Sequence, residues 1–125
     1  MKKFLIVVLL LLALLSACRS DPAGFAGIFR DPAQTIDVRI NQEFAVAITS
    51  NPASAYMWRE DFDGKFLEMV DSTFEINEEK RGTDAMLEQQ FRFRALKKGQ
   101  TTLRLNLKGP DLRTVNIVEF KVNIK

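Results

Sequence analysis

Apolar and polar residues alternate with a period of two along most of the chain from residue 35 onward. Ile36, Val38 and Ile40 are separated by Asp37 and Arg39, so one face of this segment is apolar. That periodicity is typical of a β-strand with one buried face. The same pattern, broken by turns that contain Asn, Gly or Pro, predicts further strands in residues 44–50, 56–60, 66–76 (one or two strands), 86–96, 102–107 and 114–124. Seven to eight short strands without helical periodicity indicate an all-β sandwich or barrel.

One pair of strands has a predicted register. Lys97-Lys98-Gly99 fits a three-residue hairpin loop, which would pair Phe93 with Leu103 on an apolar face. The same register sets Arg92 opposite Arg104 on the outer face. We interpret the outer arginines as a solvated face, and the alternative is a basic stripe that contacts anionic lipid headgroups (Arg92, Arg94 and Arg104).

The apolar residues of the last predicted strand form two groups that would face opposite sides of a regular strand. Val115 and Ile117 alternate on one parity, and the following set alternates on the other (Phe120, Val122 and Ile124). A β-bulge, which inserts one extra residue into a strand, would bring both sets to one face. We therefore predict a bulge near Val118–Glu119.

Composition and charge exclude several classes of function. The chain has 125 residues, enough for one domain. It has no His and one Cys, which excludes His-based catalysis, His or multi-Cys metal sites and an internal disulfide. The net charge of +2 equals the charge of Lys2 and Lys3, which lie in a segment we expect to be removed, so nothing in the mature chain indicates nucleic-acid binding. We expect no enzymatic activity, no metal and no cofactor.

Residues 1–17 have the layout of an export signal. A basic start, Met1–Lys3, precedes an apolar run, Phe4–Leu15, that is shorter than the roughly 20 residues of a membrane-spanning helix. Leu15-Ser16-Ala17-Cys18 resembles the bacterial lipobox, whose Cys is acylated and becomes the mature N-terminus. The alternative is an ordinary signal peptide followed by a chance Cys. The resemblance implies a lipoprotein anchored in the cell envelope through Cys18.

Residues 18–34 are expected to form a tether between the lipid and the domain. They contain two Asp-Pro pairs, which favour turns over regular structure. Phe25, Ile28 and Phe29 are available to dock on the domain, which we expect to span residues 35–125. Arg19, in place of the Asp that favours inner-membrane retention, resembles outer-membrane sorting if the source has two membranes, with the domain in the periplasm or at the cell surface.

A loop between two predicted strands holds the only Tyr and the only Trp of the chain. It begins with Asn51-Pro52, a strong turn signal, and continues through three small residues to Tyr56 and Trp58. Tyr56 and Trp58 share a parity, so on a strand both would face the core. One interpretation is a structural loop that leads into a strand with two core aromatics. The other is a binding loop supported by them.

The order of residue types in this loop resembles the chagasin family of inhibitors of papain-like cysteine proteases. The family pattern is Asn-Pro-Thr-Thr-Gly, then Tyr or Phe, then Trp two residues later, and here Ala53, Ser54 and Ala55 stand for Thr-Thr-Gly. Later segments follow in the family's order, namely Gly82-Thr83, Phe91 to Leu96, Thr102 to Leu107 and Gly109-Pro110-Asp111. The resemblance covers about residues 35–125 and implies an immunoglobulin-like β-sandwich.

The resemblance also implies a site and a function. In the family, three loops at one end of the sandwich wedge into the protease cleft. The corresponding residues here are Asn51, Pro52, Ala53, Ser54, Ala55 and Tyr56 in the first loop, Gly82, Thr83, Asp84 and Ala85 in the second, and Gly109, Pro110 and Asp111 in the third. The expected protein is a monomeric, membrane-anchored, reversible inhibitor of a papain-like cysteine protease. The alternative is a non-inhibitory envelope lipoprotein that uses the same fold as a protein-binding or assembly module.

Overall fold

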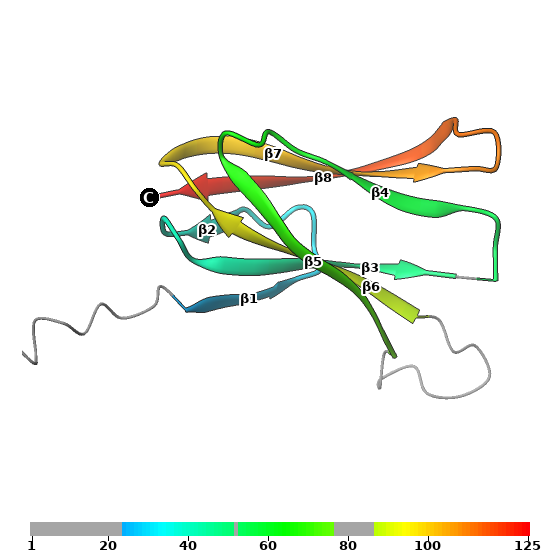
Figure 1. Ribbon diagram of the computed structural model, residues 1–125, viewed down its shortest axis with the longest axis horizontal. Helices are drawn as coiled ribbons and strands as arrows, with labels where there is room; N and C mark the ends of the chain where they lie inside the picture. The colour runs from blue at the N-terminus through cyan, green and yellow to red at the C-terminus, as the bar shows by residue number, and fades with distance from the viewer. Residues whose placement is uncertain (1–23, 52, 77–86) are drawn as a thin grey trace, which may run out of the picture.

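The protein is a sandwich of two β-sheets. The computed structural model describes residues 24–51, 53–76 and 87–125. The strands there are β1 (Phe25–Phe29), β2 (Ile36–Val38), β3 (Glu43–Ser50), β4 (Met57–Asp61), β5 (Leu67–Ile76), β6 (Leu87–Ala95), β7 (Gly99–Lys108) and β8 (Thr114–Ile124). They form two four-stranded sheets, ordered β1-β3-β6-β5 and β2-β8-β7-β4, which are the two layers of Figure 1. This confirms the predicted immunoglobulin-like β-sandwich. No helix of the described ranges has the length and apolar character to cross a membrane.

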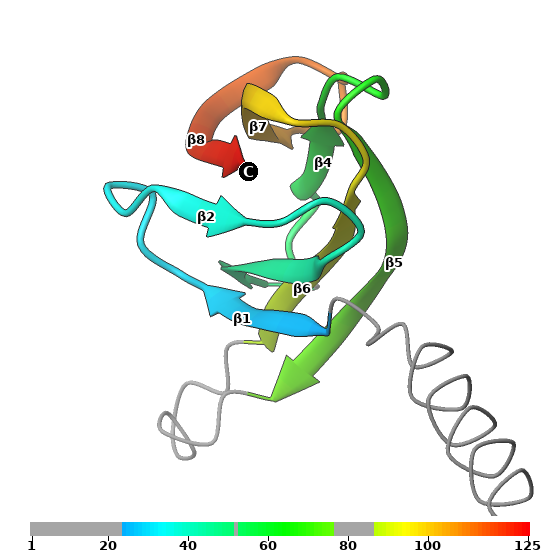
Figure 2. The ribbon, with the colours of Figure 1, turned by 90° about the vertical axis from the view of Figure 1, so that its left-hand side faces the viewer.

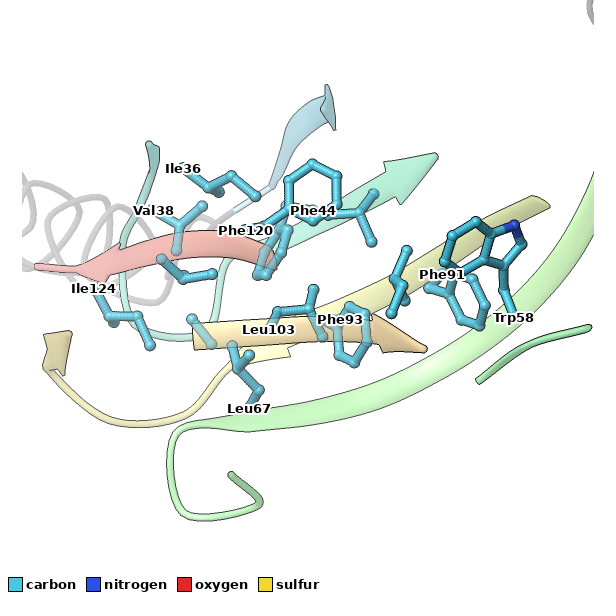
Figure 3. Packing of buried hydrophobic residues seen from close by; sticks show 14 residues of the cluster. Ile36, Val38, Phe44, Trp58, Leu67, Phe91, Phe93, Leu103, Phe120 and Ile124 are labelled. Atoms are coloured by element: carbon cyan, nitrogen blue, oxygen red, sulfur yellow. The ribbon is translucent and has the colours of Figure 1, made fainter. Parts of the chain in front are cut away.

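The inward faces of both sheets supply the core (Figure 3). Phe93 lies at its centre and is fully buried. Its ring stacks on Phe44 with the centroids 5.8 Å apart, and Phe62 meets it edge-on at 5.1 Å. Such aromatic pairs add to the stabilisation from burial alone. The alternating residues that predicted the strands therefore meet between the sheets.

The predicted hairpin between β6 and β7 is wrong, because the chain passes from one sheet to the other there. In the first sheet Phe93 lies opposite Phe44 and Met69, whereas in the second sheet Leu103 lies opposite Phe120. Phe93 and Leu103 are both buried in the core. Alternation places a side chain toward the core but does not say which of the two sheets carries the strand.

The basic stripe does not form, because its arginines lie on opposite sheets. Arg92 lies on the first sheet, and its guanidinium carbon is 4.4 Å from the centroid of the Phe25 ring. Arg104 lies on the second sheet, and its Nε donates a hydrogen bond of 2.7 Å to Glu119. That hydrogen bond is the main cause that raises the pKa of Arg104.

Part of the expected tether belongs to the sandwich. Residues 25–29 form β1, which pairs in parallel with β3 so that Phe25 lies opposite Glu43 and Ile28 opposite Ala45. The register shifts between Phe25 and Ile28, where Gly27 has a φ of 135°. This irregularity disrupts the period-two pattern and explains why the sequence did not predict a strand. The folded part therefore begins before residue 35, and Cys18 and the export signal lie outside the described residues.

The predicted bulge in the last strand lies elsewhere. Leu107 pairs with Asn116 and Lys108 with Thr114, so Val115 is the extra residue. Pairing is regular through Val118–Glu119. Val115 and Ile117 are therefore exposed, by 57% and 54%, and do not join the core.

Candidate functional site at one end of the sandwich

The β3–β4 and β7–β8 connections lie at the same end of the sandwich, at the right of Figure 1, and β5 ends and β6 begins at this end. In the first sheet Leu87, at the start of β6, lies opposite both Ser50 and Ile76. In the second sheet Lys108 lies opposite Met57. The strand ends therefore place the described parts of the first and third loops at one end, together with the end of β5 and the start of β6. Pro52 and the second-loop residues Gly82, Thr83, Asp84 and Ala85 lie outside the described residues.

The first loop is stabilised by hydrogen bonds within itself. The Asn51 side-chain oxygen accepts from the Ala53 N–H at 3.0 Å, and the Asn51 carbonyl accepts from the Ser54 N–H at 3.0 Å. The Ser54 hydroxyl donates to the Asn51 carbonyl at 2.8 Å and lies 3.3 Å from the Tyr56 N and O atoms. Asn and Ser side chains commonly replace backbone partners in this way in turns. Ala53 and Ala55 are both exposed on this loop.

Ala55 fits the backbone without strain. Among the described residues other than glycine, positive φ occurs at Asn41 and Leu112. Ala55 therefore avoids the left-handed region, where a Cβ costs about 1 kcal/mol. Alanine is compatible with this loop at the position where the family pattern has glycine.

The two aromatic residues of the first loop have different environments. Trp58 is 8% exposed, and its indole N–H donates to the Thr49 carbonyl at 3.2 Å. This bond joins β3 to β4 at the base of the loop and so links the two sheets. Tyr56 is 44% exposed and precedes the first residue of β4, so the prediction that both rings face the core is wrong for Tyr56. Side chains alternate between two faces only within a strand, and Tyr56 lies in the loop before the strand.

The third loop is a tight turn closed by Asp111 and Arg113. The Leu112 N–H donates to the Gly109 carbonyl at 2.9 Å, and the Gly109 N–H donates to the Arg113 carbonyl at 3.1 Å. The Asp111 carboxylate accepts from the Arg113 N–H at 3.2 Å and lies 3.6 Å from its Nε. The side chain of Arg113 is 85% exposed, so this bridge adds little to stability. The bridge nevertheless holds the cation of Arg113 beside Pro110-Asp111, and no cation was predicted there from the sequence.

The first and third loops touch through Tyr56 and Gly109. Gly109 is buried, and a Cβ built on it would lie 2.9 Å from Cε1 of Tyr56 and 3.4 Å from its Cδ1. The Tyr56 ring therefore lies directly on the backbone of Gly109. Glycine is required for this contact because any side chain would meet the ring.

A family model for the chagasin family peptidase inhibitors I42 matches residues 37–124. The chain belongs to the chagasin family. Membership fits the expectation that it is not an enzyme, since this is a family of inhibitors. A search of curated proteins gave no match.

Two solved structures share the fold. The cysteine protease inhibitor EhICP2 from Entamoeba histolytica superposes with a TM-score of 0.69 at 17% identity, covering 83% of this chain and 99% of its own. Amebosin superposes with a TM-score of 0.60 at 15% identity, covering 79% of this chain and 97% of its own. At these low sequence identities, the similarity to the two structures shows a shared fold only.

Apolar side chains surround the chagasin-type loops and were not predicted as site residues. Met57 follows Tyr56 in the chain and is 48% exposed, and Leu112 in the third loop is 77% exposed. Val115 lies three residues beyond Leu112, and Ile76 ends β5 at the entry to the second loop. Exposed apolar residues that gather in one place indicate an interaction surface. In the sequence, Leu112 could have indicated this surface, because it is an apolar residue in an otherwise polar turn.

Replacing Ser54 by alanine tests how strongly the first loop depends on its internal bonds. The variant loses the hydroxyl that joins Asn51 to Tyr56, so we expect weaker protease inhibition by roughly fivefold to tenfold, the equivalent of about 1 kcal/mol. Ser54→Thr keeps the hydroxyl and serves as the matched control. Inhibition constants of the two variants are compared on one protease, and equal values would show that the hydroxyl is not needed.

Proposed function

We propose that this protein is a reversible inhibitor of papain-like cysteine proteases that is held at a membrane by acylated Cys18. The observation that carries the inhibitory part is the contact of the Tyr56 ring with Gly109, in a chain of the chagasin family. This contact makes the first and third loops one continuous surface. The apolar side chains of Met57 and Leu112 border that surface.

The proposed mechanism is steric occlusion of the protease cleft. The first loop, held by Asn51 and Ser54, enters the cleft with the small residues Ala53 and Ala55 at its surface. The third loop contacts one flank of the cleft through Leu112 and Arg113, and the second loop covers the other flank. A loop fixed by its own hydrogen bonds loses little conformational entropy on binding, which favours affinity. No covalent bond to the protease forms or breaks.

The membrane anchor is supported by sequence. Cys18 follows Leu15-Ser16-Ala17 at the end of an apolar run, as the lipobox requires. One acyl chain gives weak binding, whereas the two or three chains of a bacterial lipoprotein give stable anchoring. The inhibitor would then act in the cell envelope, at the outer membrane where the source has two membranes.

Inhibition is tested with the full chain expressed in a bacterial host and purified in a mild detergent. We expect papain, or another protease of its class, to be inhibited with a constant of about 1 μM or lower. Activity should return on dilution, and the inhibitor should keep its mass. No inhibition by 10 μM protein (about tenfold above the expected constant) across a panel of such proteases would overturn the proposal.

The non-inhibitory alternative makes a different prediction in the same preparation. A pulldown from envelope extract would recover a partner that is not a protease, and Asp111→Ala would reduce its recovery. That result together with no inhibition would replace the inhibitor by a binding or assembly module.

A further inference from the structure

The end of the sandwich opposite the loops faces the viewer in Figure 2, and we call it the basal face. Backbone hydrogen bonds join its connections: the Asn41 N–H donates to the Ala95 carbonyl at 2.7 Å, and the Leu96 N–H donates to the Phe66 carbonyl at 2.8 Å. The basal face consists of the connections β2–β3, β4–β5 and β6–β7 (residues 39–42, 62–66 and 96–98). These bonds fix the three segments relative to one another.

The basal face is basic. Its charged residues are Arg39, Lys65, Lys97 and Lys98 against Asp63. The side-chain oxygen of Asp63 accepts a hydrogen bond from the backbone N–H of Lys65 at 2.9 Å, so this carboxylate also has a structural role in its turn. Within the described ranges, the salt bridges to carboxylates are made by arginines, and none of them includes these lysines (Arg30, Arg94, Arg104 and Arg113). The Lys97 ammonium lies over the Phe66 ring, 5.5 Å from its centroid, so the carboxylate-free lysines of this face can still meet an external anion.

Two apolar side chains lie among these cations. Ile40 is 42% exposed and Leu96 is 38% exposed. They flank the hydrogen bond between Asn41 and Ala95, so they lie on adjacent segments of the face. Basic residues together with exposed apolar residues match a bilayer that has anionic headgroups, because headgroups attract the cations and the interface accepts the apolar groups.

The chain enters the sandwich at this end. Phe25 lies opposite Glu43, the first residue of β3, and the Glu43 N–H donates to the Gly24 carbonyl at 3.0 Å. Strand β3 then runs away from the basal face and ends at the first loop. Residues 19–24 are all that separate Cys18 from Phe25, and a chain of this length spans at most about 25 Å. An acylated Cys18 would therefore hold the basal face close to the bilayer.

We propose that the basal face docks on an anionic bilayer surface and that the three loops consequently point away from the membrane. This inference rests on the lipid anchor of the proposed function. At physiological salt, electrostatic attraction extends about 8 Å, and the short connection allows the lysines to come within that range of the headgroups. The eight residues of β3 span about 24 Å, which separates the loops from the headgroups and leaves them accessible to a protease in solution.

A pair of labelled variants tests this orientation. Leu96→Cys and Leu112→Cys each replace an exposed leucine, the first on the basal face and the second in the third loop. Each full-length variant is expressed in a bacterial host, its acylation is measured by mass, and the added thiol receives a fluorophore. The proteins are reconstituted into phosphatidylcholine vesicles with or without phosphatidylglycerol, and quenching by headgroup spin-labelled lipid is recorded.

We expect quenching at position 96 to exceed that at position 112 severalfold on the anionic vesicles. Adding Lys97→Glu and Lys98→Glu, or raising the salt concentration, should lower the quenching at position 96 to its value on phosphatidylcholine. Equal quenching at the two positions, or stronger quenching at position 112, would overturn the orientation.

The outcomes separate this proposal from the proposed function. A mature chain without the acyl mass overturns the anchor and the orientation together, and inhibition of papain in solution still tests the loops. An acylated chain without quenching at position 96 on anionic vesicles overturns the orientation alone. In that case an acidic protein, and not lipid, becomes the ligand expected for the basal face.

Discussion

Gly109→Ala is expected to weaken protease inhibition roughly 30-fold, the equivalent of about 2 kcal/mol. The added Cβ would lie 2.9 Å from Cε1 of Tyr56 and 3.3 Å from a carboxylate oxygen of Asp111. The Tyr56 ring is 44% exposed, so it can move away while the core keeps its packing. The first and third loops then lose the contact that makes them one surface. Because the backbone of Gly109 does not have positive φ, alanine adds the clash without backbone strain.

Gly64→Ala provides the matched control. Gly64 lies in the β4–β5 connection at the opposite end, and a Cβ there would meet no atom within 4 Å. We expect this variant to inhibit like the parent protein. The free energy of unfolding should change by less than about 1 kcal/mol in both variants, because Gly64 is exposed and the added methyl at the buried Gly109 meets the movable ring of Tyr56. A normal inhibition constant for Gly109→Ala would show that the Tyr56 contact does not serve binding.

Phe93→Ala is expected to lower the free energy of unfolding by about 3–5 kcal/mol. Phe93 is fully buried between the two sheets, where it stacks on Phe44 and meets the edge of Phe62. The substitution removes the ring from the apolar interior and leaves a cavity lined by aromatic groups. Total stabilities of small domains are about 5–15 kcal/mol, so the loss is a large fraction. Urea unfolding followed by Trp58 fluorescence measures it.

Phe74→Ala removes the same ring from a different environment. Phe74 lies on the edge strand β5 and is 47% exposed. We expect a loss of about 1 kcal/mol or less, because the ring already contacts water and no closed cavity forms. Similar losses for the two variants would contradict the central position of Phe93 in the core.

The sequence predicted candidate loop residues but not the contacts between them. The order Asn51 to Trp58 located the first loop, and the strands around it placed all three loops at strand ends. The sequence did not indicate that Tyr56 lies outside the strand and packs on Gly109, because that contact joins residues more than fifty positions apart. The exposure of Leu112 and Arg113 depends in the same way on how the third loop closes through Gly109.

The sequence by itself determined the class of fold, because side chains on a strand alternate between its two faces and the core must be apolar. That alternation identified many buried positions, including Phe44, Phe91, Phe93 and Phe120, but it missed Leu67 in β5. Only the tertiary structure decided which strands share a sheet. Phe93 and Leu103 face the core equally well as neighbours in a hairpin or as members of opposite sheets, and the structure has the second arrangement.

Tertiary contacts also decided where the domain begins. Strand β1 gains its stability from pairing with β3, and the irregularity at Gly27 removes the alternation that would have revealed it. Local pattern thus determined which side chains are buried, since burial follows from hydrophobicity and strand geometry. Strand partners, the contact between the loops and the clustering of lysines at the basal face depend on residues distant in sequence, and only the folded chain brings these together.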